Sequence, residues 1–142
     1  MTDKRGPIGS VYVKAQFSGE PKAFHTEEAI HFYSGRYYQI MGTTKEGLPT
    51  LTVFSTFEFE PTKFYTLVEN PEKEGQAGLM FSHEIPGGIK TTHYEGQMRL
   101  VAEADALHAD FEGSSIVQSG SQPAQTIKGS YRVRYRSQRS TR

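Results

Sequence analysis

The sequence predicts an all-β protein, a single-domain antiparallel β-sandwich or barrel of about nine or ten strands. Apolar and polar residues alternate with period two along most of the chain, whereas matches to the helical i, i+3, i+4 spacing are short and broken. Turn signals such as "SGR", "TTKEGLP", "ENPEKEGQ" and "IPGG" separate the alternating runs. The length, 142 residues, is that of one domain with one core.

Alternation assigns one face of each run to the core, because successive side chains of a strand point to opposite faces. In the first half of the chain the runs are "VYVKAQF", "RYYQIMGTT" and "TLTVFSTFEFE". Their core-facing positions are Val11, Val13, Ala15, Phe17, Tyr38, Ile40, Leu51, Val53, Phe57 and Phe59. If 23–33 is also a strand, Phe24, Ile30 and Phe32 face the core, and the opposite face holds His25, Glu27, Ala29, His31 and Tyr33.

The second half of the chain continues the pattern in "QMRLVAE", "ALHADFEG" and "TIKGSYRVRYR". Core-facing positions there are Met98, Leu100, Ala102, Leu107, Ala109, Phe111, Ile127, Tyr131, Val133 and Tyr135. The stretch "EAD" at 103–105 is expected to be a tight turn. We therefore expect one domain over residues 1–136, followed by a basic tail at 137–142 that is disordered.

Charge and composition exclude several classes of protein. The chain contains no cysteine, which excludes disulfides, thiolate metal sites and a cysteine nucleophile. The start "MTDKRGPIGS" is not followed by the apolar region of a signal peptide, and no apolar run reaches the roughly 18 residues of a membrane span. We expect a cytoplasmic protein as encoded, or an envelope protein if the sequence is a trimmed form.

The segment "AFHTEEAIHFYSG" holds two histidines and two glutamates within eight positions, a cluster that suggests a metal or acid-base site. On a strand, His25 and His31 would lie about 20 Å apart, whereas two ligands of one zinc lie within about 4 Å of each other. A helix beginning near Thr26 would instead make Glu27 and His31 neighbours at i, i+4. We favour the solvated strand face, so no metal or cofactor is expected, and His25, Glu27 and His31 are the candidates if one binds.

Catalytic motifs are missing from the sequence. No serine stands in GxSxG, and no glycine pattern is followed by the Lys-Ser/Thr of a phosphate-binding loop. These observations favour a protein that is not an enzyme.

Four aromatic residues, Tyr12, Tyr33, Tyr37 and Phe54, fall on faces opposite the predicted core. Such a face is either covered by a loop or a subunit, or is an exposed platform that binds a sugar or a protein.

The end of the chain is basic. Residues 132–142 hold five arginines and no acid, while the other 131 residues hold eleven basic and sixteen acidic ones, a formal charge of −5. Arg132, Arg134 and Arg136 share one outer face, where they can protect a strand edge or meet an acidic surface. The acidic body disfavours nucleic acid as the partner.

The order of segments "FSGEPKAF", "YYQIMGTT", "LTVFSTFEF", "YEGQMRLV", "LHADFEG" and "IKGSYRV" resembles a group of small bacterial β-sandwich proteins without a known function, many of them lipoproteins. The resemblance covers most of the chain and implies the same fold, but no chemistry and no functional residues. The chain departs from the group because it lacks the cysteine to which a lipid would be attached.

We expect an interaction module that binds a protein partner or itself, as a homodimer, through the aromatic face, with the three arginines as electrostatic support. The first alternative is a carbohydrate or other small ligand held by a sandwich or a lipocalin-like barrel. The second is a metal-dependent enzyme that uses the histidines.

Overall fold

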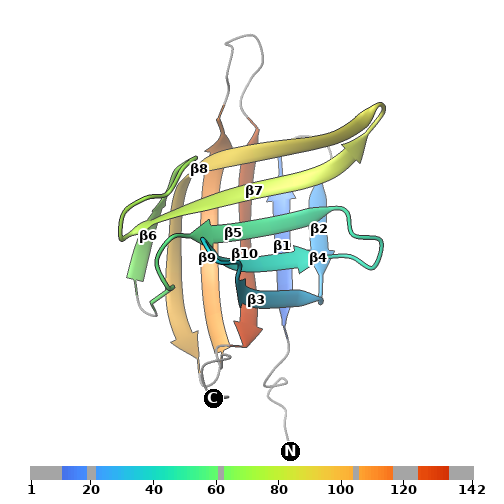
Figure 1. The fold of residues 1–142 in the computed structure, drawn as a ribbon. Helices are drawn as coiled ribbons and strands as arrows, with labels where there is room; N and C mark the ends of the chain where they lie inside the picture. The colour runs from blue at the N-terminus through green and yellow to red at the C-terminus, as the bar shows by residue number, and fades with distance from the viewer. Residues whose placement is uncertain (1–10, 19–21, 61–62, 104–105, 117–124, 135–142) are drawn as a thin grey trace, which may run out of the picture.

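The strands that the structure describes all belong to one sheet (Figure 1). The computed structural model describes residues 11–18, 22–60, 63–103, 106–116 and 125–134, and no helix occurs among them. The strands are β1 (Tyr12–Phe17), β2 (Ala23–Thr26), β3 (Ala29–Tyr33), β4 (Tyr38–Thr43), β5 (Thr50–Ser55), β6 (Lys63–Leu67), β7 (Gln76–Ile85), β8 (Gly88–Glu103), β9 (Ala106–Ser115) and β10 (Thr126–Arg134). Their order is β2-β1-β10-β9-β8-β6-β7-β5-β4-β3, with a further pairing of β7 with β8. The predicted all-β class is confirmed.

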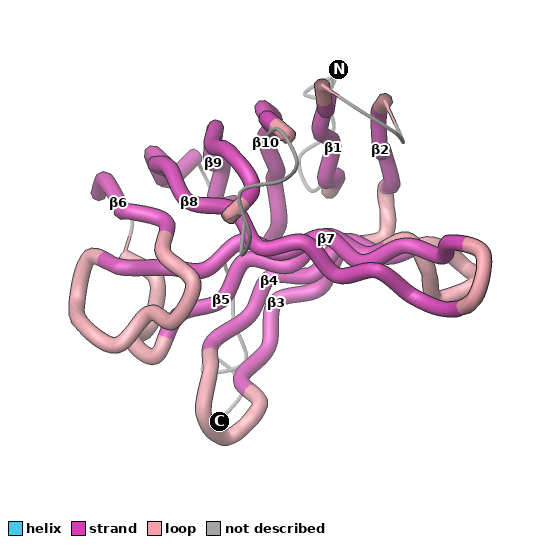
Figure 2. The backbone as a smooth tube through the Cα atoms, turned by 90° about the horizontal axis from the view of Figure 1, so that it is seen from above, coloured by secondary structure: helices cyan, strands magenta, loops and turns pink. Residues whose placement is uncertain are grey.

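The sheet folds into two layers whose strands cross, as Figure 2 shows from above. We call β2, β1, β10, β9, β6 and the second half of β8 the six-strand layer, and β7, β5, β4 and β3 the four-strand layer. β8 connects the layers, because it pairs with β7 as far as Tyr94 and with β6 from Gly96 onward. Gly96 permits this change of neighbour, since a Cβ there would collide with the carbonyl oxygen of Glu112 on β9.

The two ends of the sheet, β2 and β3, are consecutive in the chain and meet at a corner. The Thr26 hydroxyl donates a hydrogen bond to the Thr43 carbonyl (2.6 Å) and accepts one from the Glu28 N–H (3.1 Å). The Thr43 N–H donates to the Glu28 carbonyl (3.0 Å). Gly42 lies directly against the Val13 side chain, which brings β4 close to β1. These contacts nearly close the sheet into a barrel.

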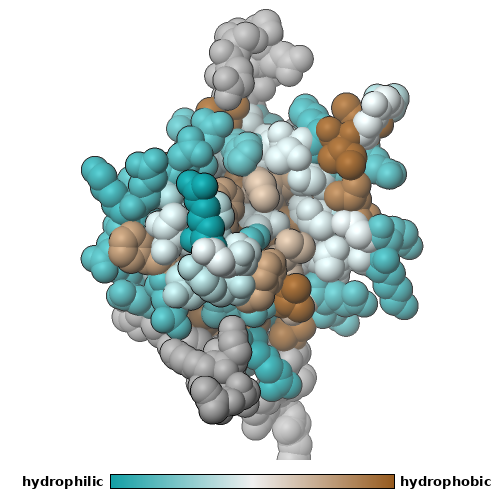
Figure 3. All heavy atoms as spheres, viewed as in Figure 1, coloured by the Kyte–Doolittle hydropathy of each residue, from teal (hydrophilic) through white to brown (hydrophobic). Residues whose placement is uncertain are grey.

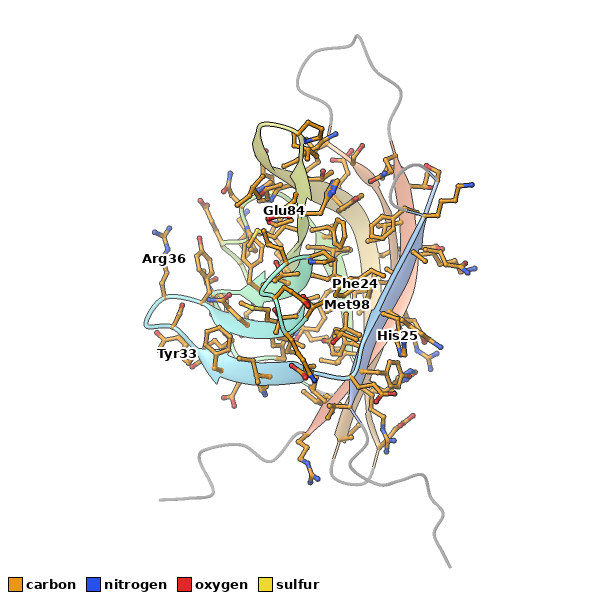
Figure 4. All side chains as sticks on the ribbon, turned by 90° about the vertical axis from the view of Figure 1, so that its right-hand side faces the viewer. Phe24, His25, Tyr33, Arg36, Glu84 and Met98 are labelled. Atoms are coloured by element: carbon orange, nitrogen blue, oxygen red, sulfur yellow. The ribbon has the colours of Figure 1, made fainter. Side chains whose placement is uncertain are left out.

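The core lies between the layers and is filled by aromatic and aliphatic side chains. Phe17 and Phe81 come from different layers, and their ring centroids are 4.7 Å apart. Figure 4 shows Phe24 of β2 and Met98 of β8 pointing into this space. The predicted core positions that are buried are Val13, Ala15, Phe17, Phe24, Ile40, Leu51, Val53, Phe59, Met98, Leu100, Leu107, Ala109, Phe111, Ile127, Tyr131 and Val133.

The segment 23–33 is neither one strand nor a helix, and the face predicted for Ile30 and Phe32 is wrong. The chain turns at Glu27 and Glu28 between β2 and β3, which shifts the alternation. His31 pairs with the buried Ile40, so the inner face of β3 holds His31, and Ile30 and Phe32 point outward.

Two further predicted core positions are exposed. β5 ends at Ser55, so Phe57 lies in the following loop. Ala102 lies next to the end of β8, where the layer ends. The predicted turn at 104–105, Tyr135, Arg136 and the tail at 137–142 lie outside the described residues.

The β7–β8 hairpin extends beyond the layers as an arm (Figure 1, Figure 2). Residues 84–91 are all exposed, including Ile85 and Ile89. His83 and His93 lie on the two sides of its turn. Within the described part of the chain, no helix is long and apolar enough to cross a membrane.

Candidate functional site

Two of the four predicted aromatic residues, Tyr37 and Phe54, lie together on the outer surface of the four-strand layer. Their rings meet edge to face with centroids 5.2 Å apart. The Arg36 guanidinium lies over the other side of the Tyr37 ring, at 5.1 Å from its centroid. Phe54 is only 8% exposed, because it packs between Tyr37 and the backbone of Gly78 on β7. This pair is therefore a packed aromatic cluster with Tyr37 at its rim.

The other two aromatic residues lie elsewhere. Tyr33 is on the inner side of β3, where its ring packs on Tyr38 with centroids 4.5 Å apart. Tyr12 is on the outer surface of the six-strand layer, and Lys14 Nζ lies 5.4 Å from its ring centroid. Tyr12, Tyr33, Tyr37 and Phe54 thus do not form one platform.

An apolar row crosses the outer surface of the four-strand layer beside the Tyr37–Phe54 cluster. The strand register places Met80 of β7 next to Thr52 of β5, Thr52 next to Met41 of β4, and Met41 next to Ile30 of β3. Thr52 is buried, the two methionines are half-buried, and Ile30 is 54% exposed. We call Ile30, Phe32, Met41, Thr52, Met80, Phe54 and Tyr37 the apolar face.

An antiparallel sheet with one wet face normally alternates apolar with polar residues, so this outer surface is unusual. In Figure 3, white to brown side chains occupy much of its middle, with hydrophilic side chains around it. At the β8 end of the row, the Nδ1 atom of His93 is buried without a hydrogen-bond partner among the described residues. Met41 and Met80 were missed in the sequence, because their meeting depends on strand pairing and not on local pattern.

The predicted arginine stripe is partly explained by contacts within the protein. Arg132 and Arg134 lie on the outer side of β10, and Arg136 is outside the described residues. Arg132 Nε is 3.4 Å from Glu103 Oε1, and Glu103 Oε2 is 3.7 Å from His108 Nδ1. Glu103 therefore engages Arg132 within the six-strand layer, which leaves Arg132 less available to a partner.

The histidine candidates do not converge. His25 is exposed on the outer side of β2, as Figure 4 shows, whereas His31 is on the inner side of β3, with its ring centroid 6.3 Å from that of Phe59. Glu27 is at the exposed corner between these strands. Among the residues with a described position, no group of three or more histidines and acids could hold a metal ion.

Two adjoining depressions mark the outer surface of the six-strand layer. One, of about 340 Å³, is lined on its outer side by Phe64, Gln97, Arg99, Asp110, Glu112 and Lys128. The other, of about 610 Å³, is lined by Lys14, Gln16, His25, Asp110, Lys128 and Ser130. Asp110 and Lys128 belong to both, so the depressions form one shallow trough that runs across the strands. Of its lining, His25 is the one candidate site residue that the sequence predicts.

Comparison with protein-family models, with curated protein sequences and with solved structures gave no match. The resemblance to small bacterial β-sandwich proteins therefore stays a prediction.

Proposed function

We propose that the protein is a non-enzymatic binding module that docks another protein chain on its apolar face. The observation that carries the proposal is the row Met80, Thr52, Met41 and Ile30, which continues across four neighbouring strands on the outside of the sheet. Exposed apolar surfaces bordered by polar residues are typical of protein interaction sites.

The composition of the face supports a protein as the ligand. Aromatic residues and methionine are enriched at the centres of interfaces, and methionine adapts its shape to a partner. Arg36 and Tyr37 lie together at the rim of this face, and both residue types are common among those that dominate binding energy.

A second copy of the chain is the first partner to test, because one face can pack against its equivalent across a twofold axis. The test is the solution mass by light scattering during size-exclusion chromatography, over a range of protein concentrations and at low and high salt. We expect a dimer that persists at high salt, because apolar burial is not screened by ions.

Met41→Glu places a charge in the middle of the face and should weaken the dimer by at least about a hundredfold, since a buried unpaired charge costs several kcal/mol. Gln16→Glu is the matched control, because it adds the same charge to the exposed outer surface of the other layer. The control should stay dimeric.

The same variants test a different protein partner. A monomer that binds an apolar fluorescent dye, and loses this binding in Met41→Glu but not in Gln16→Glu, has an accessible apolar face for such a partner. A monomer that binds no dye would contradict the proposal. A dimer that dissociates in high salt would assign the contact to charged residues such as Arg132 and Arg134 instead.

A further inference from the structure

The trough on the six-strand layer lies on the other side of the molecule from the apolar face, so its use is independent of the proposed function. Strand register arranges its lining in two rows. The first row runs from Phe64 of β6 through Arg99, Asp110, Ser130 and Lys14 to His25 of β2. The second runs from Gln97 of β8 through Glu112 and Lys128 to Gln16 of β1. Six strands at about 4.8 Å spacing give the trough a length of about 24 Å.

The shape of the trough comes from side-chain size. Ser130 is a short residue between Asp110 on one side and Lys14 on the other, and it is only 8% exposed. The longer side chains of Lys14, Lys128 and Asp110 stand around it as walls. At the β6 end, Phe64 is 71% exposed, the most exposed large apolar residue in the described part of the protein. Its ring is therefore available to stack on a ligand.

The charged groups of the trough alternate in sign and are open to a ligand. Arg99 is next to Asp110, and Glu112 is next to Lys128. Within the described ranges, no ion pair or side-chain hydrogen bond joins these neighbours, and Asp110 is 4.0 Å from His108 Nε2. Hydrogen-bond donors and acceptors therefore alternate along the whole surface.

This alternation selects the chemistry of the ligand. An anionic polymer would meet Asp110 and Glu112, and a cationic one would meet Lys14, Arg99 and Lys128. A sugar hydroxyl both donates and accepts, so it can pair with either kind of side chain without a net charge. Aromatic rings have the apolar face needed to pack against the C–H groups of a sugar ring.

We propose that the trough binds a neutral oligosaccharide, with Phe64 stacking on one sugar ring and with Arg99, Asp110, Glu112 and Lys128 bonding the hydroxyls. The trough is long enough for an extended chain of several sugars, because it runs for about 24 Å across six strands. The protein then holds a glycan on one layer while its apolar face remains available on the other.

The test is calorimetric titration of the full chain with cellohexaose, maltohexaose and mannohexaose, with hexagalacturonate as the acidic comparison. We expect at least one neutral oligosaccharide to bind with a dissociation constant below about 1 mM. Phe64→Ala should weaken that binding by about tenfold, the equivalent of one lost ring contact, and Arg99→Gln by a similar factor. Phe57→Ala is the matched control, because it removes another exposed phenylalanine away from the trough, and its binding should be unchanged.

Both trough substitutions are at exposed positions, and equal urea midpoints would show that they leave the fold intact. The proposal is overturned if no neutral oligosaccharide binds, if only hexagalacturonate binds, or if Phe64→Ala and Arg99→Gln bind as the wild type does. Met41→Glu should bind the sugar normally, so failure of the glycan site and failure of protein docking are separate results.

Discussion

The ring of Phe54 on β5 lies over Gly78 on β7, in the space that a Cβ at position 78 would need. A glycine in the middle of a strand normally weakens it, because it has no side chain to pack. Here the Phe54 ring fills the space that a side chain at position 78 would occupy. This placement buries Phe54 and brings its ring into edge-to-face contact with Tyr37. One glycine thus shapes the aromatic end of the apolar face.

Gly78→Ala should lower the free energy of unfolding by about 1–3 kcal/mol, because the added methyl group forces the Phe54 ring out of its place. In a Phe54→Ala background the same change should be neutral or stabilising, since alanine packs better than glycine in a strand. Urea unfolding of the two single variants and the double variant measures this coupling. If Gly78→Ala costs the same free energy of unfolding in the wild type and in Phe54→Ala, the contact between the Phe54 ring and Gly78 is contradicted.

Gly129→Ala should destabilise the six-strand layer more than Gly42→Ala destabilises the corner. At Gly129 a Cβ would collide with the backbone of Lys14 and Ala15, and a backbone cannot rotate away. At Gly42 it would meet the Cβ and Cγ2 atoms of Val13 at 2.6 Å, a less close approach, and Val13→Ala should relieve only the part of the cost that comes from Cγ2, because alanine keeps the Cβ. Urea unfolding midpoints measure the destabilisation that each variant causes. A smaller destabilisation by Gly129→Ala than by Gly42→Ala would be inconsistent with the close approach of β1 and β10.

Alkaline pH should lower the stability of the protein through its buried tyrosines. Burial raises the pKa of the Tyr94 and Tyr131 hydroxyls, and also that of Tyr65, where the hydrogen bond from the Glu60 N–H partly offsets the rise. These residues stay protonated in the folded protein while they ionise in the unfolded chain above about pH 10. Their stabilising contribution is therefore present below that pH and is lost as pH rises toward the folded pKa.

The expected slope is a loss of up to about 1.4 kcal/mol per pH unit for each such tyrosine, measured by urea unfolding between about pH 9 and pH 11. Tyr131→Phe should reduce this slope by up to about 1.4 kcal/mol per pH unit, because one group fewer releases a proton on unfolding. This variant should fold, because within the described structure the Tyr131 hydroxyl donates only to Met98 Sδ, at 3.9 Å. An unchanged slope would show that Tyr131 titrates normally.

Glu103→Gln should cost about 0.2–1 kcal/mol of stability at low salt, since it removes the carboxylate between Arg132 and His108. The cost should shrink at high salt, because the pair is partly exposed and is screened. Glu112→Gln is the control on the same surface, where the described residues include no ion pair to Glu112. Equal costs for the two variants would contradict a role of Glu103 in the layer.

Sequence reasoning was most accurate where strands are regular. Val13, Ala15 and Phe17 in β1, or Leu107, Ala109 and Phe111 in β9, follow the period of two and are buried as predicted. It was wrong at Ile30 and Phe32, because a two-residue turn at Glu27 and Glu28 exchanges the faces of the strand that follows. Apart from the polar residues Glu27 and Glu28, the sequence contains no signal for a turn at this point.

The candidate sites were harder to predict. Tyr37 and Phe54 were singled out together, and the structure brings them together. Met41 and Met80 join them only through the pairing of β4, β5 and β7, and the trough depends on six strands lying side by side. Residues far apart in the chain form both surfaces.

The alternation of apolar and polar residues predicts the all-β class, the positions of most strands and the inward face of each regular strand, because alternation is a local property of an extended chain. The strand order, the corner at Glu27 and Glu28, and the outer residues that become neighbours follow only from the way the strands pair and the layers pack. Pairing and packing join distant segments of the chain, and the strand register sets which side chains share a surface.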